Sequence, residues 1–190
     1  MTFAITGDPA ADRLLNTNGT ALLIGMLLDQ QVPMEWAFRG PATLEQRLGH
    51  LDASRIAAMD DRELVEVCRR KPAIHRFPQS MGRRIHQLCV HLDEHFGGDG
   101  SGVWSDQPDA PTLARRISDL PGFGAEKSMI FLALLAKRFD VRPEGWEEYA
   151  GPFADDVPRS AADVDGESSL TQVREWKRAQ KAARKGKQDP

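Results

Sequence analysis

The segment on which the interpretation of this chain depends is Leu120-Pro121-Gly122-Phe123-Gly124-Ala125-Glu126-Lys127-Ser128. A helical pattern over residues 112–120 precedes it, and a strongly apolar helical pattern over residues 124–139 follows it. Gly122 and Gly124 let the chain turn sharply, and they let its backbone approach another molecule without a Cβ in between. The segment therefore predicts two helices joined by a tight glycine turn.

The start of the second helix has a chemical property of its own. The amides of Gly124, Ala125 and Glu126 fall where a helix has free N–H groups and partial positive charge, a combination that binds anions. A DNA phosphate would fit there, and such a contact does not depend on base sequence. Taken alone, the pattern is nearly as typical of a plain turn between two packed helices, so both interpretations stay open at this point.

The rest of the chain is predicted to be helical as well. Apolar residues recur at helical spacing over 20–31, 60–68, 80–96 and 168–176, whereas the alternation typical of strands is scarce. The run 20–31 is apolar on nearly all sides and predicts a central, buried helix. Thr43-Leu44-Glu45-Gln46 has the form of a capping box and predicts a helix that begins there. We therefore expect an all-α fold.

The charge of the chain is unevenly distributed. The 190 residues carry a formal net charge of −3, yet residues 174–190 hold seven basic side chains and two acidic ones. The basic residues of this tail are Arg174, Lys177, Arg178, Lys181, Arg184, Lys185 and Lys187. Such asymmetry is typical of a tail that attracts phosphates, and equally of a solvated tail that aids solubility.

Cysteine usage and hydropathy exclude several classes of protein. The two cysteines, Cys68 and Cys89, cannot supply a four-thiolate iron–sulfur cluster, and we expect both to be buried thiols. The five histidines show no spacing typical of a metal site, so no metal is expected. No apolar run approaches the length of a membrane span, and the first residues do not resemble a secretory signal. We expect a cytoplasmic, monomeric protein associated with the nucleoid.

Residues 20–140 resemble the helix-hairpin-helix (HhH-GPD) superfamily of DNA glycosylases, which includes endonuclease III. The resemblance rests on the long helical run from Ser80, the loop at Gly97-Gly98, the short helix ending at Leu120 and the hairpin after it, in the order and spacing of that family. Leu27-Leu28-Asp29-Gln30-Gln31 is similar to the family's L-x-x-Q-Q helix end. Arg142-Pro143-Glu144-Gly145-Trp146 is similar to an element of its compact, cluster-free bacterial members.

The resemblance implies a fold and a function. The fold would be a single two-lobed helical unit, residues 1–173, around a central cleft. One lobe would span about 20–137 with the hairpin at 120–128, the other 1–19 plus 138–173, and a basic tail would follow at 174–190. The function would be base excision repair: a damaged or mismatched base in double-stranded DNA is flipped out and its N-glycosidic bond is hydrolysed. A non-catalytic protein that binds DNA lesions or structures is the alternative.

The resemblance also implies which residues contact DNA. The hairpin would grip the backbone beside the lesion, and Gln31 would fill the space left by the flipped base; a helix-terminal glutamine bonded to local backbone is the equal alternative. The predicted DNA-binding residues are Gln31, Gly122, Phe123, Gly124, Ala125, Glu126 and Lys127. A monovalent cation bound by hairpin carbonyls is implied by the resemblance alone.

The catalytic residues are harder to assign, because the Asp-x-His pattern of the family is missing downstream of the hairpin. Asp140 is the nearest carboxylate by motif order and is our choice, while Glu144 falls at the expected count. Lys127 lies one residue beyond the slot of the family's lyase lysine; a one-residue longer hairpin would restore it, and a surface lysine near phosphate is the alternative.

Further residues could take part in binding. His75-Arg76-Phe77-Pro78 and Trp36 could line a base pocket, where an aromatic face stacks on the flipped base, although packing in the core or between lobes is the favoured interpretation of Trp36. Arg83 and Arg84 could contact phosphate or simply solvate the outer face of their helix.

Overall fold

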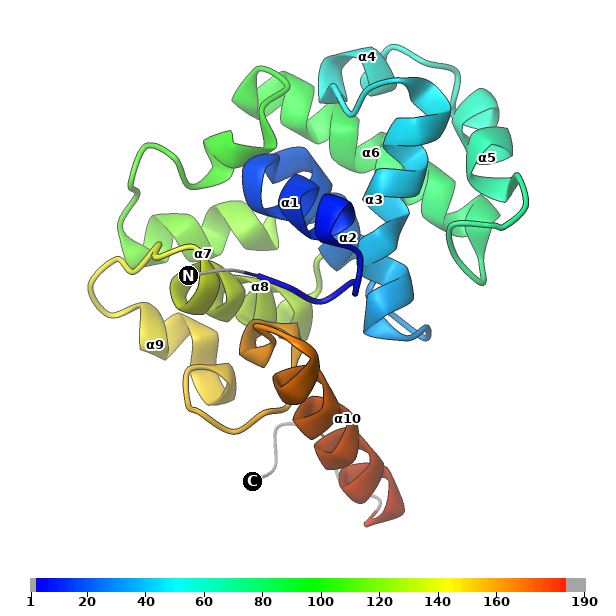
Figure 1. Cartoon of the computed structure of the whole chain (residues 1–190). Coiled ribbons are helices and arrows are strands. Elements are labelled where there is room, and N and C mark those ends of the chain that lie inside the picture. The colour runs from blue at the N-terminus through cyan, green and yellow to red at the C-terminus, as the bar shows by residue number, and fades with distance from the viewer. Residues whose placement is uncertain (1–2, 184–190) are drawn as a thin grey trace.

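The computed structural model describes residues 3–183, and over that range the chain is helical with no β-strand (Figure 1). The predicted all-α fold class is therefore confirmed. The α-helices in chain order are α1 (Pro9–Thr17), α2 (Gly19–Leu28), α3 (Met34–Leu48), α4 (Ala53–Ala57), α5 (Asp61–Arg69), α6 (Pro78–Phe96), α7 (Ala110–Ser118), α8 (Ala125–Arg138), α9 (Trp146–Ala150) and α10 (Glu167–Ala182). Three 3₁₀ turns lie between them: η1 (Gly100–Val103), η2 (Gly151–Phe153) and η3 (Ala161–Asp163).

Aspartates begin many of these helices. The side chains of Asp8, Asp52, Asp60 and Asp109 each accept a hydrogen bond from an amide of the following first turn. Each carboxylate thereby satisfies an amide that has no partner within its helix, at the end where negative charge is favourable. Local sequence therefore sets the starts of α1, α4, α5 and α7.

The start of α3 differs from the prediction. The capping-box pattern at Thr43 predicted a helix beginning there, but α3 already begins at Met34 and carries Pro41 inside it. Thr43 lies within the helix, and its hydroxyl donates to the carbonyl of Arg39 at 3.3 Å. The earlier turns form because Met34 and Phe38 are buried, so packing outweighs the local signal.

Helix α2 is the centre of the molecule. Every residue from Thr20 to Leu28 is buried, and the helix packs against α1, α3 and α6. A single hydrophobic cluster extends from Phe3 to Val173. The single folded unit, its two lobes, the central cleft and the lobe boundaries remain predictions.

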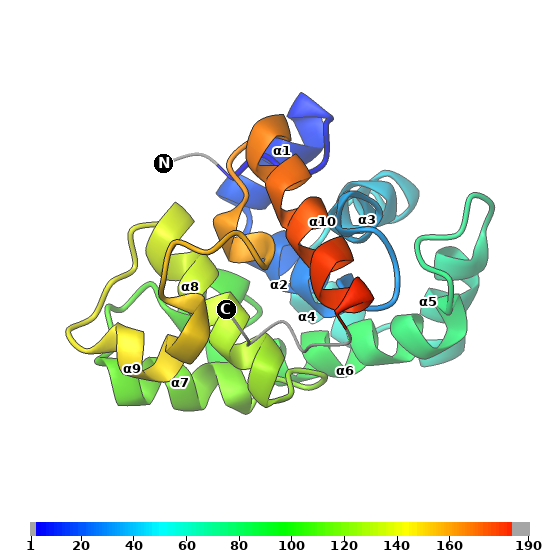
Figure 2. The same cartoon turned by 90° about the horizontal axis from the view of Figure 1, so that it is seen from below.

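The last helix carries the first part of the basic tail. Arg174 of α10 forms an ion pair with Glu35, and Lys177 Nζ lies 3.3 Å from Met34 Sδ, so α10 packs against the beginning of α3. Figure 2 shows α10 between α7, α8 and α9 on one side and α3 and α5 on the other. Arg178 and Lys181 are exposed; Arg184, Lys185 and Lys187 lie outside the described residues. No helix in the range 3–183 is both long and apolar enough to cross a membrane.

Candidate nucleic-acid interface

The predicted hairpin is present between α7 and α8. The turn closes with a hydrogen bond from the Phe123 amide to the Leu120 carbonyl at 3.0 Å. Gly122 has φ +86°, and a Cβ built on it would lie 2.4 Å from Leu27 Cδ1. Two separate constraints, backbone conformation and close packing on α2, therefore require glycine at this position.

The beginning of α8 is open. Its N-cap is Gly124, which provides no side-chain cap, and a Cβ built on Gly124 would meet nothing within 4 Å. Gly124 and Ala125 are exposed, whereas Glu126 is half-buried. Backbone amides at an uncapped, solvent-facing helix start can receive an anion, which is the property that the sequence predicted.

Phe123 anchors the turn from inside. Its side chain is buried and meets Phe131 of α8 edge to face, with ring centroids 5.6 Å apart. The aromatic ring is therefore part of the core, and the part of Phe123 that remains for a DNA contact is its backbone.

Lys127 fastens the hairpin to the end of α2. Its ammonium donates to the carbonyls of Met26 (2.5 Å) and Leu27 (2.9 Å) and lies 3.5 Å from that of Asp29. These are carbonyls at the negative end of α2, where a cation is favourable. A nucleophilic role for this amine would require it to give up these hydrogen bonds, so the geometry favours a structural lysine.

Gln31 follows directly after the segment that Lys127 holds. It is exposed and has φ +56°, a left-handed conformation that is uncommon for a residue with a side chain. The preceding Gln30 is fixed: its amide nitrogen donates to the Leu27 carbonyl at 2.9 Å, and Arg84 donates to its side-chain oxygen at 3.2 Å. An exposed side chain on a strained, well-anchored turn is suited to insertion into a partner.

A buried histidine supports this turn from the other side. His75 Nε2 lies 3.0 Å from the Gln30 carbonyl, and the Phe77 amide donates to His75 Nδ1 at 3.0 Å. The two contacts define a neutral imidazole with its proton on Nε2. Burial lowers the pKa of His75, which agrees with the neutral form.

The aromatic residues singled out from the sequence gather around this histidine. The Trp36 ring lies 6.4 Å and the Phe77 ring 6.0 Å from the imidazole, measured between ring centroids. Trp36 is 38% and Phe77 41% exposed. Two exposed aromatic faces therefore lie close to the Gln31 turn.

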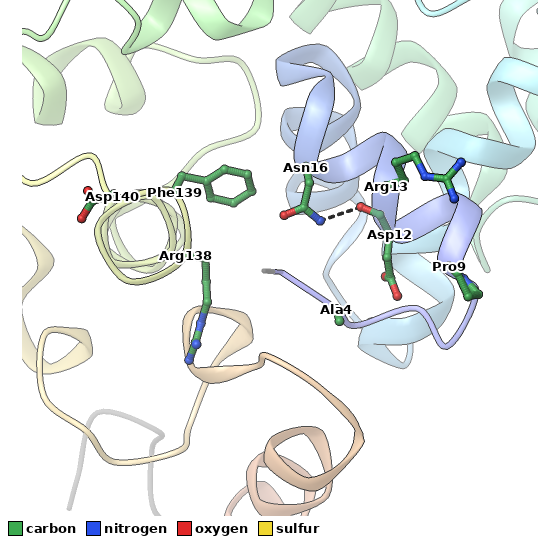
Figure 3. Close-up of a pocket in the computed structure, with 8 residues that line it drawn as sticks. All are labelled: Ala4, Pro9, Asp12, Arg13, Asn16, Arg138, Phe139 and Asp140. Carbon is green, nitrogen blue, oxygen red and sulfur yellow. Dashed lines mark hydrogen bonds between the residues drawn. The ribbon is translucent and has the colours of Figure 1, made fainter. Parts of the chain in front are cut away.

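The structure does not bring Asp140 and Glu144 to the hairpin. Both follow the far end of α8, and the 14 residues of this helix span about 20 Å at 1.5 Å per residue. The Asp140 side chain is 80% exposed and lies 3.6 Å from Arg142 Nε. Figure 3 shows it turned away from α1, on the opposite side of α8. The predicted carboxylates are thus separated from Gln31, Lys127 and the glycine turn.

A cavity that Asp140 helps to line has polar wall groups that are engaged in structural contacts. It measures about 730 Å³ between α1 and the end of α8 (Figure 3). Asp12 in its wall accepts hydrogen bonds from the amides of Ile5 and Thr6 and from the Thr6 hydroxyl. Arg138 is bonded to the Ala162 carbonyl. Its polar groups thus hold the N-terminal segment and η3 in place.

The described residues were compared with the patterns of metal sites and reactive thiols. Between residues 3 and 183 no three His, Cys, Asp or Glu side chains are grouped so that they could hold a metal ion. Burial raises the pKa of both Cys68 and Cys89 to about 12, so neither is a reactive thiolate. A monovalent cation at the hairpin carbonyls, which the family resemblance implies, remains an expectation.

One feature escaped the sequence analysis. Residues 69–87 contain six arginine or lysine side chains and no acidic one. The charge pattern is visible in the sequence. That four of these arginines converge on one pocket is visible only in the fold.

The comparisons with known proteins agree with this geometry. The family model described as HhH-GPD superfamily base excision DNA repair protein matches residues 24–187, a range that includes the second half of α2, the hairpin and α10. No curated protein and no solved structure matches the chain. This chain therefore belongs to the HhH-GPD superfamily of base excision DNA repair proteins.

Proposed function

We propose that this chain is a DNA glycosylase that acts, as a monomer, on double-stranded DNA containing a damaged or mismatched base. The observation that carries the proposal is the junction of two elements. The open helix start at Gly124-Ala125 adjoins the exposed, strained Gln31, and Lys127 joins the two through the end of α2. An anion site beside an insertable side chain is what a base-flipping protein needs.

In this proposal each element has a separate task. The amides of Gly124 and Ala125 bind a phosphate of the strand that carries the lesion. Gln31 occupies the gap in the stack, and the rigidity of Gln30 keeps it there. Trp36 and Phe77 offer aromatic faces to unstacked bases, since any base can stack on them.

Hydrolysis of the glycosidic bond also needs a carboxylate that stabilises positive charge on the sugar and activates water. Asp140 and Glu144 are the candidates from the family pattern. Asp29 is a further candidate, because it lies between the hairpin and Gln31. Its backbone carbonyl oxygen is 3.5 Å from Lys127 Nζ.

The test is base release from a panel of duplexes containing uracil, alkylated purines, oxidised purines or mismatched adenine. We expect release of one class as free base without borohydride trapping, because the Lys127 amine is engaged with carbonyls. Efficient trapping that Lys127→Gln abolishes would instead establish a lyase. Asp29→Asn, Asp140→Asn and Glu144→Gln, assayed on the released base, identify the carboxylate by loss of release with binding retained.

The separation of Asp140 and Glu144 from the hairpin specifically favours a second function, a lesion-binding protein without catalysis. That function predicts salt-sensitive binding to a duplex with an abasic-site analogue and no base release from any member of the panel. A carboxylate variant that keeps full binding and loses release rules it out.

A further inference from the structure

A second basic site lies on the other side of the Gln31 turn. A cavity of about 640 Å³ at the beginning of α6 is lined by Arg69, Arg76, Arg83, Arg84 and Phe77, among others. We call these five residues the arginine pocket. Four guanidinium groups therefore gather in one pocket, although the net charge of the chain is negative. Bidentate arginines and an aromatic face are the groups that recognise a phosphodiester and its base.

The positive charge of the arginine pocket is only weakly compensated. Arg83 is 3.8 Å from Asp61 and Arg69 is 3.2 Å from Glu66, and all four side chains are at least 46% exposed. Such exposed pairs contribute little, so an incoming phosphate can replace the carboxylate as a partner.

Phe77 gives the arginine pocket an apolar face. The Arg76 guanidinium lies 5.2 Å from the centre of the Phe77 ring, and that ring is 41% exposed. Arg76 and Arg83 are exposed as well. The cavity is therefore an open edge along which a strand can pass, rather than an enclosed chamber for a small ligand.

The arginine pocket is directly coupled to the turn that carries Gln31. Arg84 donates to the Gln30 side chain at 3.2 Å, and His75, which precedes Arg76, lies 3.0 Å from the Gln30 carbonyl. On the opposite side, Lys127 ties the same segment to the hairpin. Gln31 is thus flanked by two anion sites, the hairpin amides and the arginine pocket.

We propose that the arginine pocket binds the backbone of the DNA strand complementary to the lesion strand, with Phe77 against one of its bases. The inference rests on the proposed DNA-binding function and deepens it. A side chain inserted into a duplex separates the two strands locally, so each strand needs its own contact with the protein. The hairpin holds the lesion strand and the arginine pocket holds its complement.

The test measures binding, not catalysis, on a duplex with a central abasic-site analogue. Single methylphosphonates, which remove one backbone charge, are placed along either strand. Wild type is compared with Arg76→Gln/Arg83→Gln. The matched control is Arg13→Gln/Arg55→Gln, which removes two exposed arginines on α1 and α4.

We expect Arg76→Gln/Arg83→Gln to weaken duplex binding by about tenfold and to reduce the slope of log affinity against log salt by about two, one for each lost phosphate contact. The control should stay within about twofold of wild type. Methylphosphonates at one or two positions of the complementary strand should weaken wild type and have no further effect on the arginine variant. Unchanged unfolding midpoints exclude misfolding.

Three results would overturn the inference. One is that the arginine variant loses sensitivity to methylphosphonates of the lesion strand instead. Another is that it equals the control. The third is that thymidine 5′-monophosphate binds in a manner that requires Arg76 and Arg83 while complementary-strand methylphosphonates have no effect, which would indicate a nucleotide site. Absence of base release leaves this inference intact and contradicts only the proposed catalysis.

Discussion

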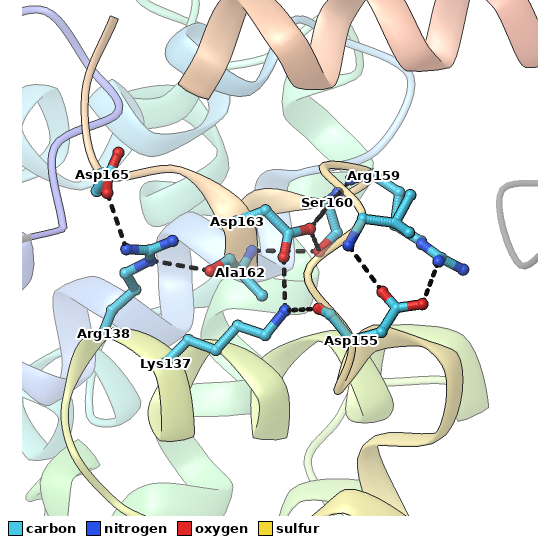
Figure 4. Close-up of polar contacts among 9 residues, drawn as sticks. Lys137, Arg138, Asp155, Arg159, Ser160, Ala162, Asp163 and Asp165 are labelled. Atoms are coloured by element: carbon cyan, nitrogen blue, oxygen red, sulfur yellow. Dashed lines mark hydrogen bonds and ion pairs between the residues drawn. The ribbon is translucent and has the colours of Figure 1, made fainter. Parts of the chain in front are cut away.

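The two ends of α8 differ in the contacts that their residues make. At the beginning, Gly124 leaves the first turn without a side-chain cap and open to solvent. At the end, Lys137 and Arg138 are surrounded by partners, as Figure 4 shows. Lys137 donates to the Asp155 carbonyl and to Asp163 Oδ1, the latter at 2.7 Å, and Arg138 donates to the Ala162 carbonyl at 2.9 Å.

The partners at this end are themselves satisfied. Asp163 Oδ2 accepts the amides of Arg159 and Ser160 at 3.1 and 3.0 Å. Arg138 also pairs with Asp165 at 3.2 Å, and Ser169 donates to the same carboxylate. The C-terminal end of α8 is therefore held by many polar contacts, which we call its saturated end, whereas Gly124 and Ala125 at its beginning are exposed.

The largest expected effect comes from breaking the saturated end. Lys137→Met removes the partner of Asp163, whose side chain is 7% exposed, and leaves a buried carboxylate. We expect a loss of about 3–5 kcal/mol in the free energy of unfolding, the usual cost of breaking a buried pair, measured by urea denaturation. DNA affinity of the folded fraction should not change.

The control for this prediction is the exposed pair of Arg115 and Asp119 on α7, at 3.6 Å. Arg115→Met should cost less than about 1 kcal/mol. Equal losses for the two variants would show that the end of α8 is no more important than a surface contact.

The next effect distinguishes the two glycines of the hairpin. Gly122→Ala forces a Cβ to within 2.4 Å of Leu27 Cδ1 at φ +86°, so we expect a loss of about 2 kcal/mol in the free energy of unfolding. The urea midpoint measures it. Retention of full stability would mean that the hairpin is not packed on α2 as described.

Gly124→Ala should weaken binding, with only the modest loss of stability that alanine causes at an N-cap. The new Cβ meets no protein atom within 4 Å, but it stands where a phosphate would approach the amides. We expect on the order of tenfold weaker duplex binding, equivalent to about 1.4 kcal/mol, by fluorescence anisotropy. Gly166→Ala is the control, because Gly166 is also the N-cap glycine of a helix, α10, and an added Cβ there also meets nothing within 4 Å, while its amide is already bonded to Ser169. Equal affinities for both variants would contradict the phosphate site.

Local signals in the sequence predicted much of this contrast. The glycine turn at Gly122–Gly124 lies where it was expected, whereas α2 ends at Leu28, before Gln30-Gln31. What the sequence could not give depends on contacts between distant segments. The Lys127 ammonium donates to the backbone carbonyl of Leu27, which lies 100 residues earlier in the chain. The length and direction of α8 separate Asp140 from the hairpin, and no count along the chain reveals that separation.

The smallest expected effect is a difference in how the Gln31 turn and the end of α8 contribute to stability as the pH changes. Near the Gln31 turn, burial lowers the pKa of His75 below its ordinary 6.5. As pH falls below that value the unfolded chain takes up a proton before the folded one does, so stability is lost between pH 6.5 and the lowered folded pKa. At the saturated end of α8, hydrogen bonding by Ser169 lowers the pKa of Asp165, so its contribution is lost only below about 3.8.

Urea unfolding of wild type and His75→Gln at pH 7.5, 6.5 and 5.5 measures this difference. We expect stability to fall less steeply with pH in His75→Gln, because this variant lacks the imidazole whose pKa is lowered. Burial also lowers the pKa of His91, but His91 contributes equally to both proteins and cancels in the comparison. The stability of Asp165→Asn should change with pH in parallel with that of wild type, since the Asp165 carboxylate of wild type stays ionised over that range in both the folded and the unfolded state. Parallel slopes for wild type and His75→Gln would mean that the imidazole does not hold the Gln30 carbonyl in its neutral form, and that the turn carrying Gln31 is supported by Arg84 and Lys127 alone.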